Sequence, residues 1–430
     1  MVRSGSASAV ERTRIVGMDA EARGKSGEAC PLVVPGALPG EAVEVVVEHS
    51  GKTARFARLL KVLEASPERT TPQCRHFLNC GGCDLLHASL PLQHHHKRQQ
   101  VALELGLPLF DVAEVVPSPQ AFEYRTVAKM VVGPGVLGSY RPRSHDVVDM
   151  SGCRIHSATV ELVLSTARAH LLAEGPGDLR YLVVREDDRR RALVLIITRA
   201  LGSSAADALA SVLAQLPQVA EIRVQENQSP GDGIFSDGPE RRVYGEAGAA
   251  VGAFSQVNPG AAAELYRVAT ELLAPAGREV LELYAGSGGL SRVLLEAGAA
   301  RVEAVEVVAP AVEVAQAWAQ TSPYADRFRI TLGRAEEVPL PAMNYVVVNP
   351  PRKGLGPVAE RLAALPIERL VYVSCNPGTL GRDLQVILQL RPDLELDSVV
   401  PVDLFPQTRH IETVVRLVRR SDVASRSSTA

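Results

Sequence analysis

Cys375 is the residue of this 430-residue chain whose setting best suits covalent chemistry. It follows the apolar run Leu370–Val373 and stands just before a helix-like stretch that opens with Asn376. The N-terminal end of a helix carries a partial positive charge, which favours the thiolate, the reactive form of cysteine. A lone cysteine is more often an inert core residue, so Cys375 by itself is only a candidate nucleophile.

A glycine-rich turn and a later acidic residue predict a pocket for an adenosyl group. The expected strand Glu279–Leu283 leads into Tyr284-Ala-Gly286-Ser-Gly-Gly289, and the next expected strand ends in Glu306. Glycines let a ligand approach bare backbone, and a carboxylate one strand later can accept hydrogen bonds from two ribose hydroxyls. A Rossmann dinucleotide site is the alternative, but the glycines follow G-x-G-G rather than G-x-G-x-x-G.

A second strand end, Asn349-Pro-Pro-Arg352, is expected to shape the same region. The two prolines keep the chain extended and rigid, which holds neighbouring polar groups near a ligand. The side chain of Asn349 can accept a hydrogen bond but cannot act as a base. Asn-Pro-Pro is also found in amino-group methyltransferases, whose chemistry does not need Cys375.

Four of the six cysteines form a candidate metal site. Cys74, Cys80 and Cys83 follow the spacing C-x5-C-x2-C, and Cys153 is a distant fourth, with Cys30 outside the set. Four thiolates from a loop and a remote segment suit an iron–sulfur cluster, whereas structural zinc more often uses paired short knuckles. We therefore predict a [4Fe-4S] cluster rather than disulfides, which a reducing compartment disfavours.

The elements that would position these residues fall into three domains. Short β segments separated by Gly, Pro and Ser predict a small barrel over residues 1–67. Strand-like runs mixed with a helical run predict a central α+β domain over 68–250, of which 91–117 is a candidate to pack on the catalytic domain. Alternating strands and helices predict a doubly wound, mostly parallel sheet over 251–420, with its ligand site beyond the strands' carboxyl ends. The Ser-rich tail 421–430 is predicted to be disordered.

Composition excludes several classes of protein. Hydrophobic residues make up 46% and charged residues 22%, which is typical of a folded globular chain. The apolar runs are far shorter than the roughly 20 residues that a membrane span needs, and the start lacks a secretory signal, so we expect a cytoplasmic protein. The net charge of −3 neither indicates nor excludes binding to nucleic acid. Residues 51–100, however, hold eight Lys and Arg against three Asp and Glu. The first half could therefore face phosphates.

Together these motifs resemble the S-adenosylmethionine-dependent RNA uracil-5-methyltransferase family. The N-terminal segment, with Ala37-Leu-Pro-Gly-Glu41, resembles the TRAM barrel, an RNA-binding module of some members. The resemblance covers nearly the whole chain and is most specific in the Cys-Asn-Pro and Phe-Pro-x-Thr-x-His-x-Glu segments. Its motifs are Tyr124-Arg125, Phe254–Asn258, Glu282–Gly289, Asn349–Gly354, Ser374–Leu384 and Leu404–Glu412.

The resemblance implies a class I, Rossmann-like methyltransferase domain with a TRAM/OB-like barrel and a central α+β domain. It implies that Cys375 adds to carbon 6 of uracil and that Glu412 later removes the proton from carbon 5. It also supports the [4Fe-4S] cluster on the four cysteines. The implied contacts of the donor, S-adenosylmethionine, are Gln256, Tyr284, Gly286, Glu306 and Asn349.

The implied reaction is 5-methylation of a uridine in structured RNA, by a monomer. The target is expected in 23S ribosomal RNA rather than transfer RNA, and in a loop, because the base must leave its stack to react. Three positions depart from the family: Asn349 replaces the usual Asp, and Gly289 and Trp318 each replace an Asn. The motif Asn349-Pro-Pro leaves open an amino-group methyltransferase, and the three departures leave open a non-catalytic RNA-binding protein of the same fold.

Overall fold

The computed structural model describes residues 10–142, 144–228, 238–245 and 256–420. Its chain divides into two compact units, of which the first holds 1–96, 121–251 and 405–409 and the second holds 97–120, 252–404 and 410–430. The expected domain boundary at 250/251, Phe254 of the family motif and the tail 421–430 lie outside the described residues. No helix of the described part is long and apolar enough to cross a bilayer.

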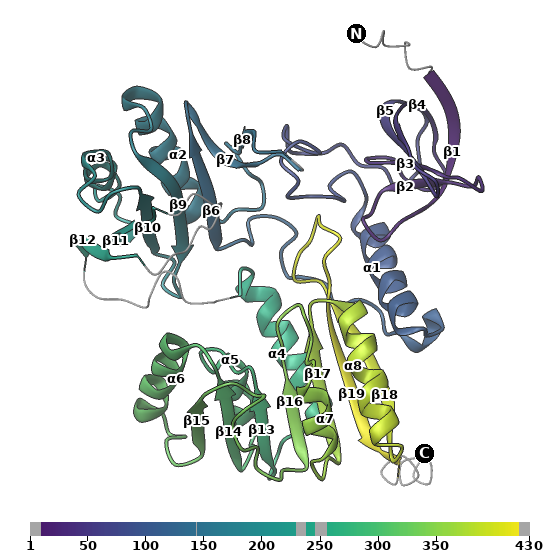
Figure 1. Ribbon diagram of the computed structural model, residues 1–430, viewed down its shortest axis with the longest axis vertical. Coiled ribbons are helices and arrows are strands. Elements are labelled where there is room, and N and C mark those ends of the chain that lie inside the picture. Colours follow the sequence, from purple (N-terminus) through teal and green to yellow (C-terminus); the bar gives the residue numbers. More distant parts are fainter. Residues whose placement is uncertain (1–9, 143, 229–237, 246–255, 421–430) are drawn as a thin grey trace. The chain divides into compact units, whose positions relative to one another are not determined.

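The first unit opens with a closed five-stranded barrel, drawn in purple in Figure 1. Its strands follow the order β1-β2-β3-β5-β4, and alternating apolar residues fill the interior, among them Ile15, Leu32 and Val45. The buried carboxylate of Glu41 accepts hydrogen bonds from the Arg69 guanidinium, which ties the barrel to the cysteine-rich segment that follows. The strands are β1 (Val10–Met18), β2 (Gly24–Ser26), β3 (Leu32–Val34), β4 (Ala42–Ser50) and β5 (Arg55–Glu64).

A seven-stranded sheet forms the rest of the first unit, in the order β12-β11-β10-β9-β6-β7-β8. Helices α2 (Ala158–Glu174) and α3 (Ser204–Leu213) share one apolar core with it, through residues such as Val163, Leu209 and Ile196. The sheet is antiparallel except where β10 pairs with β11. The strands are β6 (Val127–Gly133), β7 (Val136–Tyr140), β8 (Val147–Asp149), β9 (Leu179–Glu186), β10 (Ala192–Thr198), β11 (Val219–Glu226) and β12 (Glu240–Gly245).

The second unit is a doubly wound sheet in the order β15-β14-β13-β16-β17-β19-β18. The first five of these strands run parallel, and β19 (Glu412–Arg419) is antiparallel to both neighbours, β17 (Arg369–Ser374) and β18 (Leu394–Val402). From β13 (Glu279–Leu283) the chain winds first to β14 and β15 and then back to β16. Such a reversal places the ligand site at the carboxyl ends of β13 and β16. The other strands are β14 (Arg301–Glu306), β15 (Phe328–Leu332) and β16 (Tyr345–Val348).

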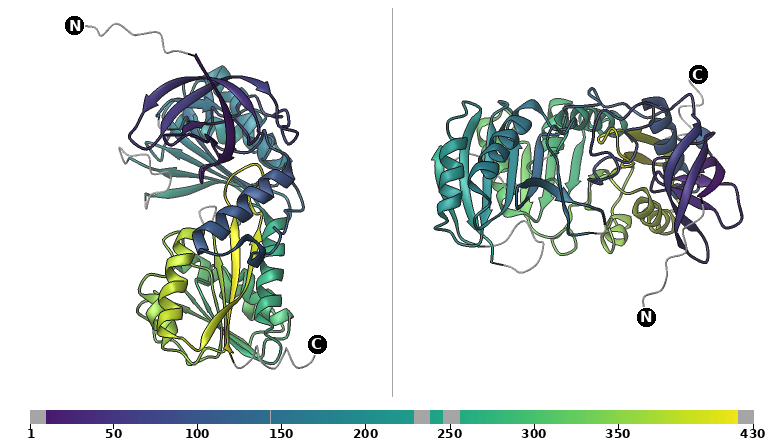
Figure 2. Two further views of the ribbon diagram at one scale, coloured as in Figure 1. Left: turned by 90° about the vertical axis from the view of Figure 1, so that its right-hand side faces the viewer. Right: turned by 90° about the horizontal axis from the view of Figure 1, so that it is seen from above.

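Helices cover both faces of this sheet, as the edge-on view in Figure 2 shows. The C-terminal half of α1 (Leu90–Leu105), whose residues from Lys97 on belong to this unit, contributes Val101 and Ala102 to the same core as α7 and α8. A short 3-10 helix, η1 (Leu109–Asp111), follows α1. The other helices are α4 (Pro259–Leu273), α5 (Gly289–Glu296), α6 (Ala309–Thr321), α7 (Val358–Ala363) and α8 (Pro377–Leu390).

Candidate active site

Cys375 lies at the carboxyl end of β17, directly before α8. Asn376 caps that helix, because its Oδ1 accepts the Gly378 N–H at 3.1 Å, and Ser374 Oγ accepts the Asn376 N–H at 3.1 Å. The thiol is partly exposed. Burial and the nearby Glu412 carboxylate raise its pKa, and Arg352 and the backbone act in the opposite direction. The sequence suggests that the positive helix end favours the thiolate of Cys375. In the structure, burial and Glu412 outweigh that effect.

Glu412 is the first residue of β19 and only 6% of its surface is exposed. Burial raises the pKa of its carboxyl group to about 8, and the charge of Arg352 lowers it in part. Glu412 also lies close enough to Cys375 to disfavour the thiolate. His410 precedes β19, which begins at Glu412.

Arg352 is a charged residue of this site whose role the sequence motif does not reveal. It lies in the loop after β16, and its side chain hydrogen-bonds Cys375. The backbone oxygen of Arg352 accepts a hydrogen bond from Asn376 Nδ2 at 3.3 Å. One cation thus favours the charged form of both Cys375 and Glu412.

The glycine-rich turn and Glu306 are joined by direct hydrogen bonds. Glu306 Oε2 accepts the Gly286 N–H at 2.8 Å, and its Oε1 accepts the N–H groups of Val307 and Val308, also at 2.8 Å. A carboxylate has about four acceptor sites, of which these bonds use three, so Oε2 can still accept a hydrogen bond from a hydroxyl group. The side chains of Val307 and Val308 are 52% and 43% exposed, which leaves an apolar surface beside Glu306.

Three residues with left-handed backbone form the turn after β13. Tyr284, Gly286 and Gly288 have φ values of 63°, 57° and 78°. Tyr284 has this left-handed backbone although it is not a glycine. Burial raises the pKa of its hydroxyl to about 12. Asn349 begins the neighbouring loop, and its N–H donates to Leu283 O at 3.3 Å. Both positions therefore lie at the switch between β13 and β16.

Tyr266 of α4 is a second residue that the sequence does not reveal. Its hydroxyl hydrogen-bonds Gln256, and burial together with Glu282 and Glu412 raises its pKa to about 12. A Cβ atom on Gly289 would stand 3.1 Å from this hydroxyl, so Tyr266 takes up room that a larger residue at 289 would need. Tyr266 thus gives a steric reason why glycine stands at position 289 in place of the family's usual Asn.

Trp318, the other departure in this region, packs against aromatic and cationic neighbours. Its ring lies edge-on to Phe328 with centroids 5.7 Å apart, and the Arg292 guanidinium stands 4.8 Å above it. These contacts join α6 to α5 and β15. Trp318 therefore has a packing role that Asn could not fill.

The chain segment that leads into Glu412 is fixed by buried polar contacts to α1. Within the second unit, Lys97 Nζ and Asp403 Oδ1 are 2.6 Å apart and both side chains are fully buried. Within the first unit, Gln93 Nε2 donates to Gln407 Oε1, and Gln93 Oε1 accepts the Gln407 N–H, each at 3.0 Å. The sequence does not indicate either contact, since the partners are more than 300 positions apart.

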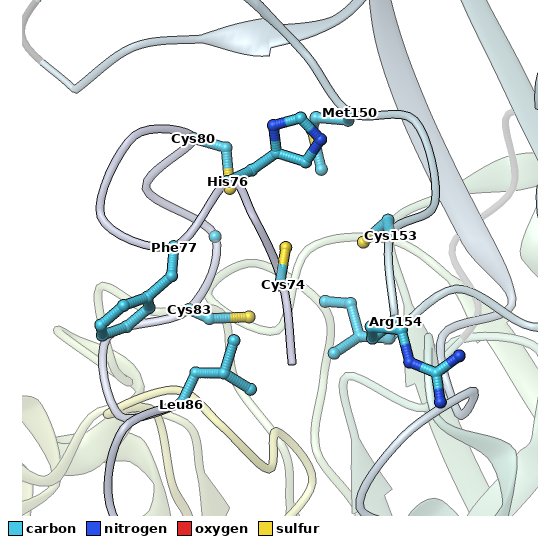
Figure 3. Close-up of a pocket in the computed structure, with 11 residues that line it drawn as sticks. Cys74, His76, Phe77, Cys80, Cys83, Leu86, Met150, Cys153 and Arg154 are labelled. Carbon is cyan, nitrogen blue, oxygen red and sulfur yellow. The ribbon is translucent and has the colours of Figure 1, made fainter. Parts of the chain in front are cut away.

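The four cysteines of the first unit line one pocket, as Figure 3 shows. The sulfur atoms of Cys74, Cys80, Cys83 and Cys153 all point toward its centre. The rest of the wall includes apolar side chains, namely Phe77, Leu86, Met150 and Ile155. Burial raises the pKa of Cys83, and the other three thiols raise it further.

The pocket has no tight single-ion site. Among the described residues, three or more His, Cys, Asp or Glu side chains nowhere come together as ligands of one metal ion. The ligands of a cubane cluster bind four different irons, so they stand farther apart than four sulfurs on one zinc ion. Four thiols that converge in one pocket are a donor set of the kind that an iron–sulfur cluster uses.

The chain is similar to known RNA methyltransferases. Residues 334–420, which hold Cys375 and Glu412, match the family described as tRNA (Uracil-5-)-methyltransferase. An uncharacterized RNA methyltransferase of Listeria innocua is 32% identical over 90% of this chain and 92% of its own length. One of Geobacter sulfurreducens is 33% identical over 90% of this chain and 85% of its own.

A solved structure shares the fold across almost the whole chain. It is that of the Pyrococcus abyssi tRNA (uracil-54, C5)-methyltransferase in complex with S-adenosyl-L-homocysteine, with a TM-score of 0.74 and 24% identity. The match covers 95% of this chain and 100% of the other. The fold is therefore that of an S-adenosylmethionine-dependent methyltransferase. With relatives above 30% identity along nearly its full length, the chain belongs to the RNA uracil-5-methyltransferase family.

Proposed function

We propose that this enzyme forms 5-methyluridine in structured RNA, with Cys375 as nucleophile and Glu412 as base. The observation that carries the proposal is that Cys375, Arg352 and Glu412 interact at the sheet edge where the glycine-rich turn and Glu306 also lie. A thiol, a cation and a buried carboxyl in one place suit covalent activation of a ring carbon.

The roles follow from the chemistry of uracil. The Cys375 thiolate adds to carbon 6, and the electron pair moves to carbon 5, which becomes able to take a methyl group. S-adenosylmethionine, when bound, would supply that methyl group from its sulfonium centre and leave as the neutral thioether S-adenosylhomocysteine. Glu412 then accepts the proton of carbon 5, the double bond re-forms and the Cys375 sulfur leaves. Arg352 stabilises the charged forms of both side chains at the start.

Residues on the other side of the site are proposed to hold the donor. Glu306 Oε2 would accept a hydrogen bond from a ribose hydroxyl, and the exposed side chains of Val307 and Val308 would face the adenine. Gln256 is held by Tyr266, which suits a contact with the amino-acid end. Tyr284, Gly286 and Asn349 line the turn between these parts.

Cys74, Cys80, Cys83 and Cys153 are proposed to hold a [4Fe-4S] cluster. The support is the convergence of the four sulfurs in one pocket and the length of chain between Cys83 and Cys153. When bound, the cluster would cross-link the cysteine-rich segment to the central sheet. No step of methyl transfer requires it. We further propose that the N-terminal barrel is a TRAM-like RNA-binding module and that the enzyme works as a cytoplasmic monomer.

Ribosomal RNA is our proposed substrate class, supported by the resemblance of the barrel and the cysteine segment to the cluster-bearing branch. The Pyrococcus abyssi protein, whose fold is similar, is by its title a tRNA methyltransferase. Nucleosides from 23S RNA and from transfer RNA, isolated separately from cells with and without this protein, distinguish the two. We expect 5-methyluridine to disappear from 23S RNA only.

The same nucleoside analysis tests the alternatives. Loss of an N-methylated base would favour the amino-group methyltransferase that Asn349-Pro-Pro suggests. An unchanged nucleoside profile would favour a non-catalytic RNA-binding protein. Either result would overturn the proposed reaction while leaving membership of the family untouched.

A further inference from the structure

Asp383 is a buried carboxylate of α8 that contacts the loop after β16. Its side chain is 6% exposed, and its Oδ2 accepts two hydrogen bonds. The Leu355 N–H donates at 2.7 Å, and the Tyr372 hydroxyl donates at 2.6 Å. Burying a carboxylate is costly unless such bonds replace its water, so this side chain is fixed in place.

The loop backbone lies directly against that carboxylate. Gly354 has φ of +81°, and a Cβ atom there would stand 2.5 Å from Asp383 Oδ2 and 3.2 Å from Thr379 Cβ. A residue other than glycine would be both strained and in collision with these atoms. The close approach therefore depends on glycine at this position.

The loop is held to α8 at two points, and Arg352 is part of the segment between them. At one point Asn376 Nδ2 donates to the Arg352 backbone oxygen at 3.3 Å. At the other, Asp383 accepts the Leu355 N–H. The Gly354 N–H donates to Pro351 O at 2.8 Å and closes the turn that contains Arg352. The side chain of Arg352 then reaches Cys375.

We propose that Asp383 is a positioning residue, which fixes the turn Pro351–Gly354 through the Leu355 N–H and so keeps the Arg352 guanidinium on the Cys375 sulfur. The inference rests on the proposed role of Cys375 as nucleophile. Among the described residues, the Glu412 carboxylate and the Tyr372 hydroxyl also interact electrostatically with this sulfur, and Tyr284 interacts with Tyr372. Arg352 is the cation among them, so its position sets the thiolate fraction of Cys375.

The test is the pH dependence of Cys375 alkylation by iodoacetamide in the full-length protein, purified without oxygen. The signal of Cys375→Ala is subtracted as background from the other thiols. Arg352→Gln should raise the midpoint by about one pH unit, because it removes the cation beside the thiol. Asp383→Leu, which removes the acceptor, should shift it in the same direction by a similar amount. Asp383→Asn, a weaker acceptor, should give a smaller shift.

Coupling and a matched control make the test specific. The double variant Asp383→Leu/Arg352→Gln should shift the midpoint no further than Arg352→Gln alone, since both changes remove one effect. Tyr372→Phe removes the other hydrogen bond to the same oxygen but leaves the loop contact, so its midpoint should stay near that of the wild type. In methylation assays, the Asp383 variants should lose kcat at neutral pH and regain it at higher pH, with unchanged KM for S-adenosylmethionine.

Two results would overturn the inference. Asp383 variants that lose thermal stability but keep the wild-type midpoint would show a purely structural role. Shifts that add in the double variant would show that Asp383 does not act through Arg352. A wild-type protein that makes no 5-methyluridine would instead refute the proposed function and leave the alkylation results as they stand.

Discussion

At the scale of single residues, the proposed covalent route requires Cys375 and Glu412 to act in sequence. Glu412→Gln should allow the thiolate to add and the methyl group to transfer, but it removes the base that takes the proton from carbon 5. We therefore expect RNA covalently bound to the protein, visible as a retarded band on a denaturing gel with labelled RNA.

Two variants complete that prediction. Cys375→Ala should give neither product nor adduct, and the double variant should behave like Cys375→Ala, since the later step cannot matter when the first is blocked. Normal turnover by Glu412→Gln, without trapped RNA, would show that another group is the base. Substantial methylation by Cys375→Ala would favour direct transfer to an amino nitrogen.

The buried carboxyl of Glu282 makes stability depend on pH. Burial raises its pKa from 4.5 to about 8, whereas the unfolded chain keeps the ordinary value. Between these values the folded state holds a proton that the unfolded state has lost, so the free energy of unfolding falls as pH rises from about 4.5 to 8. At 1.36 kcal/mol per unit, the fall from this one group is on the order of 4–5 kcal/mol.

Glu282→Gln should therefore flatten the loss of stability between pH 5 and 8, as measured by urea unfolding at several pH values. Glu279→Gln, an exposed change on the same strand, is the matched control and should keep the wild-type slope. Equal slopes in all three proteins would mean that Glu282 does not titrate in this range in the folded state.

At the scale of elements, the sequence predicts best where one strand or helix carries its own pattern. The run Ala192–Thr198 is continuous and apolar, and β10 has those same bounds. The strand β2 has only three residues, which are too few for a recognisable pattern. Helix α2 was not predicted, although Ser157 caps it and Glu161 lies in its first turn. The position of antiparallel β19 between β17 and β18 depends on long-range strand pairing, which no local sequence pattern predicts.

The candidate site divides in the same way. Cys375, Gly286 and Glu306 follow strands with clear motifs, so their placement at one sheet edge could be predicted from topology. Contacts with residues distant in the sequence determine the roles of Arg352, Tyr266 and Asp383, so local motifs do not reveal them. Burial and the nearby Glu412 carboxylate also raise the pKa of Cys375, which the helix end alone would lower.

The buried ion pair between Lys97 of α1 and Asp403, directly after β18, is expected to stabilise the fold. Lys97→Met leaves a carboxylate in a fully buried place without its cation. Breaking a buried pair in this way typically costs about 3–5 kcal/mol. Urea unfolding should show a loss of that size, together with reduced methylation, because Asp403 precedes the segment that leads to Glu412.

An exposed pair in the barrel supplies the comparison. Arg12 contacts Glu44 at 2.7 Å, but the Arg12 side chain is 75% exposed. Arg12→Met should cost less than about 1 kcal/mol, as solvent-exposed pairs usually do. If the two variants lose similar stability, the Lys97–Asp403 contact does not have the weight that its burial implies.

At the scale of the whole molecule, the proposed cluster would connect parts that are far apart in the sequence. Cys74, Cys80 and Cys83 lie in an irregular segment after the barrel, whereas Cys153 follows the edge strand β8 of the central sheet. Other contacts also link these regions, such as the Arg75–Asp149 pair at 3.8 Å. A long irregular segment gains little stability from its own packing, so a metal cross-link would stabilise it most.

The cluster proposal therefore predicts both composition and stability. Protein purified without oxygen should be brown and contain about four iron and four sulfide per chain. Cys83→Ser should lose most of the iron and lower the melting temperature, because the segment loses its link to the central sheet. Cys30→Ser, which changes a cysteine of the barrel outside the pocket, should keep the iron content and the melting temperature of the wild type. One equivalent of zinc in a colourless protein, or a Cys83→Ser variant with full iron, would refute the cluster, whereas full iron loss with an unchanged melting temperature would refute only its structural role.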